Sequence, residues 1–191
     1  FKSDMLTHLG TICMLRAMAK IEVKCPTKGW TIESVKLHRY NRTGLCAPDK
    51  VYDEPDYVEG GYYSDGSLDI HIVDGVADDG ELSFEKLDDG RFVIYVPEYR
   101  NTTDGRSRAA DAAEIRMKFE ERQDKDYVID FKYYENPPEN FSIGDWFDIR
   151  RNYYYKFSIS KNAEYDDNLK ISIDVDPYDE YTLDPIFGVD K

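Results

Sequence analysis

Apolar and charged residues alternate along residues 15–25, with Met18 as the one break in the pattern. A period of two places successive side chains on opposite faces of a β-strand. The segment is therefore predicted to be a half-buried strand. The side chains expected to face the core are Leu15, Ala17, Ala19, Ile21 and Val23. Those expected to face solvent or another surface are Lys20, Glu22 and Lys24.

The same alternation recurs along the chain and predicts further strands. The clearest repeats lie at residues 68–72, 127–133, 153–159 and 169–175, and shorter candidates at 35–40, 82–87 and 92–96. Residues 104–121 carry four alanines between positions 109 and 113 and end in alternation, which predicts a loop or helical turn that leads into a strand. No rhythm of alternating strands and helices is present, so the parallel α/β classes are disfavoured.

Asp-Gly pairs separate several of these segments. Asp and Gly tolerate the left-handed backbone that tight hairpins need. The pairs are Asp65-Gly66, Asp74-Gly75, Asp79-Gly80 and Asp89-Gly90, and the last is predicted to close a tight antiparallel hairpin. Together with a high content of Tyr and Phe, this pattern predicts an all-β fold. We expect an antiparallel β-sandwich of about seven to nine strands with long loops.

Length and charge narrow the function classes. The chain has 191 residues and a formal net charge of −14, which suits one large domain and disfavours nucleic acid as a partner. No apolar run approaches the ~20 residues of a membrane-spanning helix. The sequence starts at Phe1 without a signal peptide, so we expect a mature or truncated piece whose targeting segment is missing.

Three cysteines do not form a recognisable framework. Cys13, Cys25 and Cys46 lack the spacing of a zinc site or a disulfide scaffold. One disulfide among them stays open as an alternative. Buried free thiols are the favoured interpretation for Cys13 and Cys25, because they lie just before and at the end of the predicted first strand.

No constellation of catalytic or metal-binding residues is recognisable, so no enzyme activity, metal or cofactor is predicted. His8, His38 and His71 have no catalytic spacing. The acidic pairs Asp78-Asp79, Asp88-Asp89 and Asp166-Asp167 could in principle serve hydrolysis or calcium binding, but none opens a calcium loop. Solvating charge is the favoured interpretation of these pairs.

Aromatic residues in predicted loops give the alternative function, a carbohydrate-binding or adhesive module. The candidates are Trp30, Trp146, Tyr57, Tyr62, Tyr63 and Tyr99, with Tyr62 and Tyr63 as the possible ligand platform. Core packing is the competing and favoured role for most of them. Triplets of the type N-x-[ST] start at Asn41, Asn101 and Asn140, and they have meaning only in a glycosylating host.

Three segments in order resemble the second domain of the fimbrillin family, the Bacteroidales-type pilus subunits. Residues 14–23 are similar to the Arg-x-x-Ala-Lys strand that opens this domain, and residues 149–159 to its Arg-Asn-aromatic-x-Tyr strand. Residues 169–188 resemble its closing part, with an alternating strand, a Pro-Tyr break and a second short strand. Residues 50–63 and 102–113 match no such pattern.

The resemblance implies a subunit of a two-domain lipoprotein built from transthyretin-like sandwiches. Such a protein is exported to the cell surface and outer membrane and assembles into fimbriae by strand donation. Its partners would be other fimbrial subunits, in a homo- or hetero-polymer, and host glycans or proteins. It would meet the membrane only through a lipid anchor outside this chain, and stalk, tip and anchor roles stay open.

The resemblance also divides the chain. Residues 1–168 would form the sandwich domain, and residues 169–191 a C-terminal strand pair that is the candidate strand-exchange appendage. Its interface residues would be Leu169, Ile171, Ile173, Val175, Tyr178, Tyr181, Leu183, Ile186 and Phe187. An ordinary final strand is the alternative. Arg150, Arg151 and Asn152 are expected to balance charge or clamp a carboxylate rather than to act in catalysis.

Overall fold

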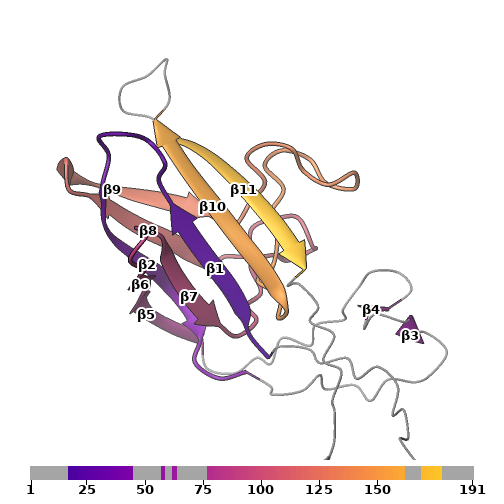
Figure 1. The fold of residues 1–191 in the computed structure, drawn as a ribbon. Coiled ribbons are helices and arrows are strands. Elements are labelled where there is room, and N and C mark those ends of the chain that lie inside the picture. The colour runs from indigo at the N-terminus through magenta and orange to yellow at the C-terminus, as the bar shows by residue number, and fades with distance from the viewer. Residues whose placement is uncertain (1–16, 45–56, 59–61, 64–76, 162–168, 178–191) are drawn as a thin grey trace, which may run out of the picture.

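Two stacked β-sheets form the main body of the part of the chain that the structure describes. The computed structural model describes residues 17–44, 57–58, 62–63, 77–161 and 169–177, and within these ranges it contains eleven strands and no helix. Figure 1 shows one sheet in front of the other, with their strands running obliquely to each other. The predicted all-β sandwich is confirmed.

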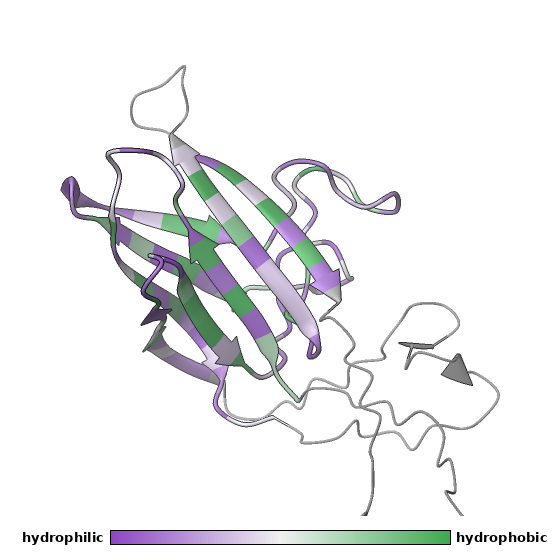
Figure 2. Cartoon of the chain, viewed as in Figure 1, coloured by the Kyte–Doolittle hydropathy of each residue, from purple (hydrophilic) through white to green (hydrophobic). Residues whose placement is uncertain are grey.

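The front sheet has five strands. In spatial order they are β11 (Leu169–Pro177), β10 (Tyr153–Lys161), β1 (Ala19–Lys24), β7 (Phe92–Val96) and β6 (Glu85–Lys86). The central strand β1 pairs parallel with β10, and every other pair of this sheet is antiparallel. Alternation of apolar and polar residues is visible along β1, β10 and β11 in Figure 2.

The second sheet has four strands, all antiparallel to their neighbours. Their order is β5 (Ala77–Ser83), β2 (Ile32–Asn41), β8 (Glu114–Phe119) and β9 (Arg122–Asp130). A separate two-stranded pair consists of β3 (Tyr57–Val58) and β4 (Tyr62–Tyr63). Residue Phe84 carries the chain from the second sheet into the first, and its backbone N–H donates to the Val35 carbonyl at 3.0 Å.

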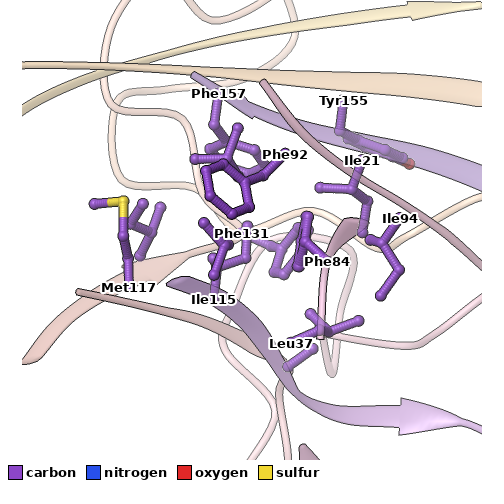
Figure 3. Close-up of a cluster of buried hydrophobic side chains, with 14 of the residues drawn as sticks. Ile21, Leu37, Phe84, Phe92, Ile94, Ile115, Met117, Phe131, Tyr155 and Phe157 are labelled. Atoms are coloured by element: carbon purple, nitrogen blue, oxygen red, sulfur yellow. The ribbon is translucent and has the colours of Figure 1, made fainter. Parts of the chain in front are cut away.

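One apolar core lies between the sheets. Side chains from both sheets meet there, among them Ile21 from β1, Phe157 from β10 and Met117 from β8 (Figure 3). The rings of Phe131 and Phe157 pack edge to face with centroids 5.5 Å apart, a favourable geometry for aromatic pairs. Ala19, Ile21 and Val23 are fully buried, so the predicted register of the first strand is confirmed for these residues.

One predicted outward-facing residue of β1 is nevertheless buried. Glu22 points away from the core but is only 3% exposed, because Arg91 and Tyr154 cover it. Arg91 Nη1 lies 2.8 Å from Glu22 Oε2, and the Tyr154 hydroxyl donates to the same oxygen. Buried carboxylates require such partners. A period of two gives the face of a residue, but neighbouring strands decide its exposure.

The Asp-Gly pairs have different outcomes. Asp89-Gly90 closes the β6–β7 hairpin as predicted, with Gly90 at φ +82° and its N–H donating to the Leu87 carbonyl. The prediction of a turn at Asp79-Gly80 was wrong, because both residues lie inside β5. There the register against β2 shifts between His38 and Tyr40. Two residues of β5 therefore lie opposite one residue of β2, which is a β-bulge.

Several predictions fall on residues outside the described ranges. These are Leu15, Cys13, Cys46, His8, His71, Asp65-Gly66, Asp74-Gly75, Asp166-Asp167 and the strand at 68–72. Cys25 is described, and it is a half-buried free thiol that packs against the core.

Candidate functional site

The outer edge of the front sheet is formed by β11, the last described strand (Figure 1). Its nine residues pair with β10 in one unbroken antiparallel register, from Leu169 opposite Lys161 to Pro177 opposite Tyr153. Within the described residues no strand pairs with the other side of β11. An edge of this kind presents unpaired N–H and C=O groups to which another chain can add a strand.

The inner face of β11 is incompletely covered. Ile173 is 8% exposed, whereas Leu169, Ile171 and Val175 are half-buried and pack against the margin of the core. This row consists of the predicted exchange residues of the strand. The other predicted exchange residues, Tyr178, Tyr181, Leu183, Ile186 and Phe187, lie outside the described ranges.

A buried ion pair lies just before β10, the strand that pairs with β11. Arg151 and Glu98 have side chains only 5% and 8% exposed. Arg151 Nε donates to Glu98 Oε1 at 2.5 Å, and Nη2 donates to Oε2 at 3.0 Å. The Glu98 carbonyl in turn accepts a hydrogen bond from Asn41 Nδ2. The sequence-based expectation of a bidentate clamp is confirmed for Arg151.

A second buried network joins the two long loops at the same end of the sandwich. Asn101 is fully buried and accepts from the Ala113 N–H with its side-chain oxygen, while its Nδ2 donates to the Phe147 carbonyl. Asp148 Oδ1 accepts from the backbone N–H groups of Asn101 and Thr102 and from the Thr102 hydroxyl. These bonds hold the loop after β7 against the segment that precedes β10.

Residues 131–152, between β9 and β10, run out and back along this end of the sandwich, and we call this aromatic-rich segment the aromatic excursion. Its two arms are hydrogen-bonded, because the Tyr133 N–H donates to the Asp145 carbonyl and the Phe147 N–H to the Phe131 carbonyl. Gly144 adopts φ +95° where the returning arm begins. Four aromatic rings follow one another here, with Phe147 stacked on Tyr155 at 5.6 Å and Tyr133 between Phe147 and Phe141.

These elements line an open cavity of about 260 Å³, which we call the aromatic cavity. Its lining residues are Gly105, Tyr133, Pro138, Phe141, Phe147, Asp148, Arg150, Tyr153, Tyr155 and Val175. The last of these belongs to β11. The aromatic cavity therefore lies beside the carboxyl-terminal end of the open edge.

Two of the tyrosines that line the aromatic cavity have raised pKa values. Tyr155 donates to the Asp148 carbonyl and accepts from the Arg150 N–H. Burial raises the pKa of Tyr155, and Arg150 opposes the rise. Burial likewise raises the pKa of Tyr133, again opposed by Arg150. Both phenols are therefore neutral at physiological pH, and the positive charge of Arg150 acts on the interior of the cavity.

The loop at the mouth of the aromatic cavity is held by an acidic residue. Asp104 accepts hydrogen bonds from the Ser107 N–H, the Ser107 hydroxyl and the Arg106 N–H. These bonds lower the pKa of Asp104 to about 2. The turn that carries Gly105 thus keeps its charged cap over the physiological pH range.

Three of the six aromatic residues that were predicted to lie in loops have packing roles in the structure. Trp146 and Tyr99 are buried, and Trp30 packs edge to face on Phe119 at 4.7 Å, so these three have packing roles. Tyr62 of β4 pairs with Val58 in the backbone and Tyr63 with Tyr57. Sequence reasoning missed the aromatic cavity, although the repeated aromatic residues between 131 and 155 were a signal.

The remaining candidate chemistry has structural neighbours. His38 lies on β2 with its Nδ1 3.3 Å from Glu114 and 3.1 Å from Arg116 Nη2. Within the described ranges no group of three or more potential ligands gathers that could hold a metal ion. No helix of those ranges is long and apolar enough to cross a membrane. Asn41 and Asn101 are buried, which argues against glycan attachment at these two positions.

Comparisons with known proteins place this fold. No protein-family profile and no curated protein sequence matches the chain. The tip fimbrial protein Mfa3 from Porphyromonas gingivalis, solved with a C-terminal truncation, superposes with a TM-score of 0.55 at 12% identity over 86% of this chain and 52% of that one. Two proteins described as cell adhesion proteins are similar over 52% of their own length. The Bacteroides uniformis protein has a TM-score of 0.47 at 8% identity over 86% of this chain, and the Parabacteroides distasonis protein 0.38 at 18% over 84%.

The chain thus spans about half the length of these solved structures. At such low identity the likeness to Mfa3 speaks for the fold and leaves residue roles to be argued from this structure. The resemblance to fimbrillin-type proteins seen in the sequence motifs is confirmed at the level of the fold, which this chain shares with a tip fimbrial protein.

Proposed function

We propose that the protein is a structural subunit of a cell-surface fimbria or pilus that assembles by pairing of β-strands between subunits. The single observation that carries this proposal is the uninterrupted edge of β11, with a half-buried apolar row beneath it. The shared fold with a tip fimbrial protein supports the same role. The stalk, tip or anchor position in such a fibre is left open.

The exchange element is proposed to be residues 169–187, divided into two parts. Residues of β11 already occupy a place in their own sheet, so the outer side of this strand can receive an incoming strand. The residues after Pro177 carry Tyr181, Leu183, Ile186 and Phe187 and are the candidate donor. Each apolar side chain that a partner buries would contribute about 25 cal/mol per Å² of area removed from water.

Deletion of residues 178–191 in the full-length subunit tests the donor. We expect the sandwich to keep its cooperative thermal transition, because both sheets contribute to a core cluster that is built from side chains between Ala19 and Val175. We expect fibre formation to be lost, as judged by electron microscopy and size-exclusion chromatography. Fibres of normal length from the deleted protein would exclude donation by this segment.

The proposed role is non-catalytic and exported. Its support is that the buried charged groups serve packing, as in the Arg151–Glu98 clamp and the covered Glu22. Screening of purified protein for hydrolysis of glycosides, esters and peptides tests this. A reproducible activity that is abolished by Arg151→Ala in a folded protein would overturn it.

A second candidate function is carbohydrate binding by an adhesive subunit. The observation in its favour is the aromatic cavity, because concave sites with a few convergent polar groups are the usual form of small-ligand sites. This function is compatible with assembly, since the cavity and the β11 edge are neighbouring but different features. Binding to a glycan array, with loss of binding after changes in the cavity, tests it.

A further inference from the structure

We propose that the aromatic cavity binds one sugar residue that carries a carboxylate, such as a uronic acid or a sialic acid. This inference rests on the second candidate function and specifies its ligand class and binding residues. The carboxylate would be held by Arg150, the ring by the aromatic side chains, and a hydroxyl by Asp148.

The size of the aromatic cavity limits the ligand. Sites for drug-sized molecules are commonly ~300–1,000 Å³, and this cavity measures about 260 Å³. It therefore suits one monosaccharide unit, with the rest of a glycan remaining in solvent. Its walls are hydrogen-bonded to one another through Asp148, Asn101 and the arms of the aromatic excursion, so little ordering free energy is lost on binding.

The ring faces supply the apolar part of the site. Tyr133, Phe141, Phe147, Tyr153 and Tyr155 all line the cavity. A pyranose has C–H groups clustered on its faces and hydroxyls around its rim, so it can place a face on an aromatic ring while its rim stays polar. Such a ligand removes apolar surface from water without burying its hydroxyls unpaired.

Arg150 gives the site its preference for an anion. Three arginines, Arg106, Arg150 and Arg151, lie at this end of the sandwich, and the guanidinium groups of two of them have partners. Arg151 binds Glu98, and Arg106 donates to the Asn140 carbonyl at 2.5 Å. Within the described residues, no carboxylate lies within ion-pair distance of the Arg150 guanidinium. A planar guanidinium without a carboxylate partner in the described residues offers a bidentate site for the carboxylate of a ligand.

Further polar groups favour a hydroxylated ligand over an apolar side chain from a partner. The hydroxyls of Tyr133 and Tyr153 make no hydrogen bond to any described residue. The side-chain carboxylate of Asp148 accepts its described bonds at Oδ1, which leaves Oδ2 available. An apolar occupant would remove these groups from water without replacing their hydrogen bonds, at a cost in binding free energy. Hydroxyls of a sugar would satisfy them.

The test uses two probes that differ only in the carboxylate, methyl β-glucuronide and methyl β-glucoside, with methyl N-acetylneuraminide as a third. Titration of the intact protein is followed by NMR, with the amides of Gly105 and Val175 as reporters of the cavity. We expect at least one acidic sugar to shift these amides and to bind about tenfold or more tightly than the glucoside, as for a charge-assisted hydrogen bond.

Two variants assign the effect. Arg150→Met keeps the backbone N–H that donates to Tyr155 and is expected to weaken binding of the acidic sugar about tenfold at an unchanged melting temperature. Arg100→Met, at an exposed arginine that does not line the cavity, is the matched control and should bind normally. If neither acidic sugar bound more tightly than the glucoside, the carboxylate class would be overturned and sugar binding left intact. No shift with any of the three sugars at millimolar concentration would overturn both the inference and the second candidate function.

Discussion

The outer edges of the two sheets differ in how well they are protected. Strand β11 pairs with β10 through nine consecutive residues without a shift. Strand β5, the edge of the second sheet, is interrupted by a bulge opposite Arg39, and it carries Asp78, Asp79 and Gly80 there. Bulges, charges and short strands are the means by which proteins prevent edge-to-edge association.

The difference agrees with the proposal that β11 is the edge used in assembly. Strand β9 also has a register shift in its pairing with β8, and exposed charges at Asp124, Lys125 and Asp126. Strand β6 has only two residues. Among the described edges, β11 is therefore the one that combines length, regular register and an apolar inner row. Selection against aggregation would disfavour such an edge unless it had a partner.

The largest expected effect on stability comes from the buried Arg151–Glu98 ion pair, which lies just before β10, the strand that pairs with β11. Arg151→Met leaves Glu98 buried without its partner, and removal of one member of a buried pair costs about 3–5 kcal/mol. We expect the free energy of unfolding to fall by this amount in urea denaturation. The double variant Arg151→Met/Glu98→Leu should recover part of the loss, because no uncompensated charge remains. Equal stability of the single variant and the unaltered protein would contradict the role of the clamp.

A smaller effect compares the inner faces of the two edges directly. Ile173→Asp in β11 places a charge at a buried position opposite Phe157, and we expect a loss of about 3 kcal/mol. Leu82→Asp in β5 changes a half-buried position, so its loss should be less than half as large. Both values follow from urea denaturation of the purified variants. A larger loss at Leu82 would reverse the assignment of which edge strand is more firmly seated.

The smallest effect concerns the bulge. A Cβ added at Gly80 would lie 2.9 Å from Asp78 Oδ1, which also accepts the Gly80 N–H. Because the contact is with the end of a side chain, Gly80→Ala should cost only about 1 kcal/mol. We expect a small decrease in melting temperature and no change in oligomeric state. A stability gain would show that the bulge does not need glycine.

The sequence predicted the strands better than their surroundings. Alternation located β1, β7, β10 and β11, because each has one apolar face toward the core. It located only the end of β5, within the predicted strand at 82–87, because the first part of Ala77–Ser83 is acidic and contains an Asp-Gly pair. Pairing with β2 overrides this local turn preference, since sheet hydrogen bonds across the chain are not visible in a local pattern.

The candidate site was predictable only in part. The clamp followed from an arginine at the start of a strand, but its partner Glu98 lies 53 residues away in sequence. The aromatic cavity depends on the return of residues 131–148 against β10, and nothing in a period of two encodes that path. Glu22 shows the same limit, because its burial arises from Tyr154 on β10 and from Arg91, which directly precedes β7.

The central claim is that the edge of β11 receives a strand, and one pair of variants in the full-length subunit tests it most directly. Ile171→Lys places a charge on the half-buried inner row, where an incoming strand would have to cover it, while the long side chain can reach solvent in the free subunit. Ser172→Lys places the same charge on the outer face of the same strand. Fibre formation measured by electron microscopy should be lost in the folded Ile171→Lys protein and retained in the Ser172→Lys protein. Fibres of normal length from both would contradict the account.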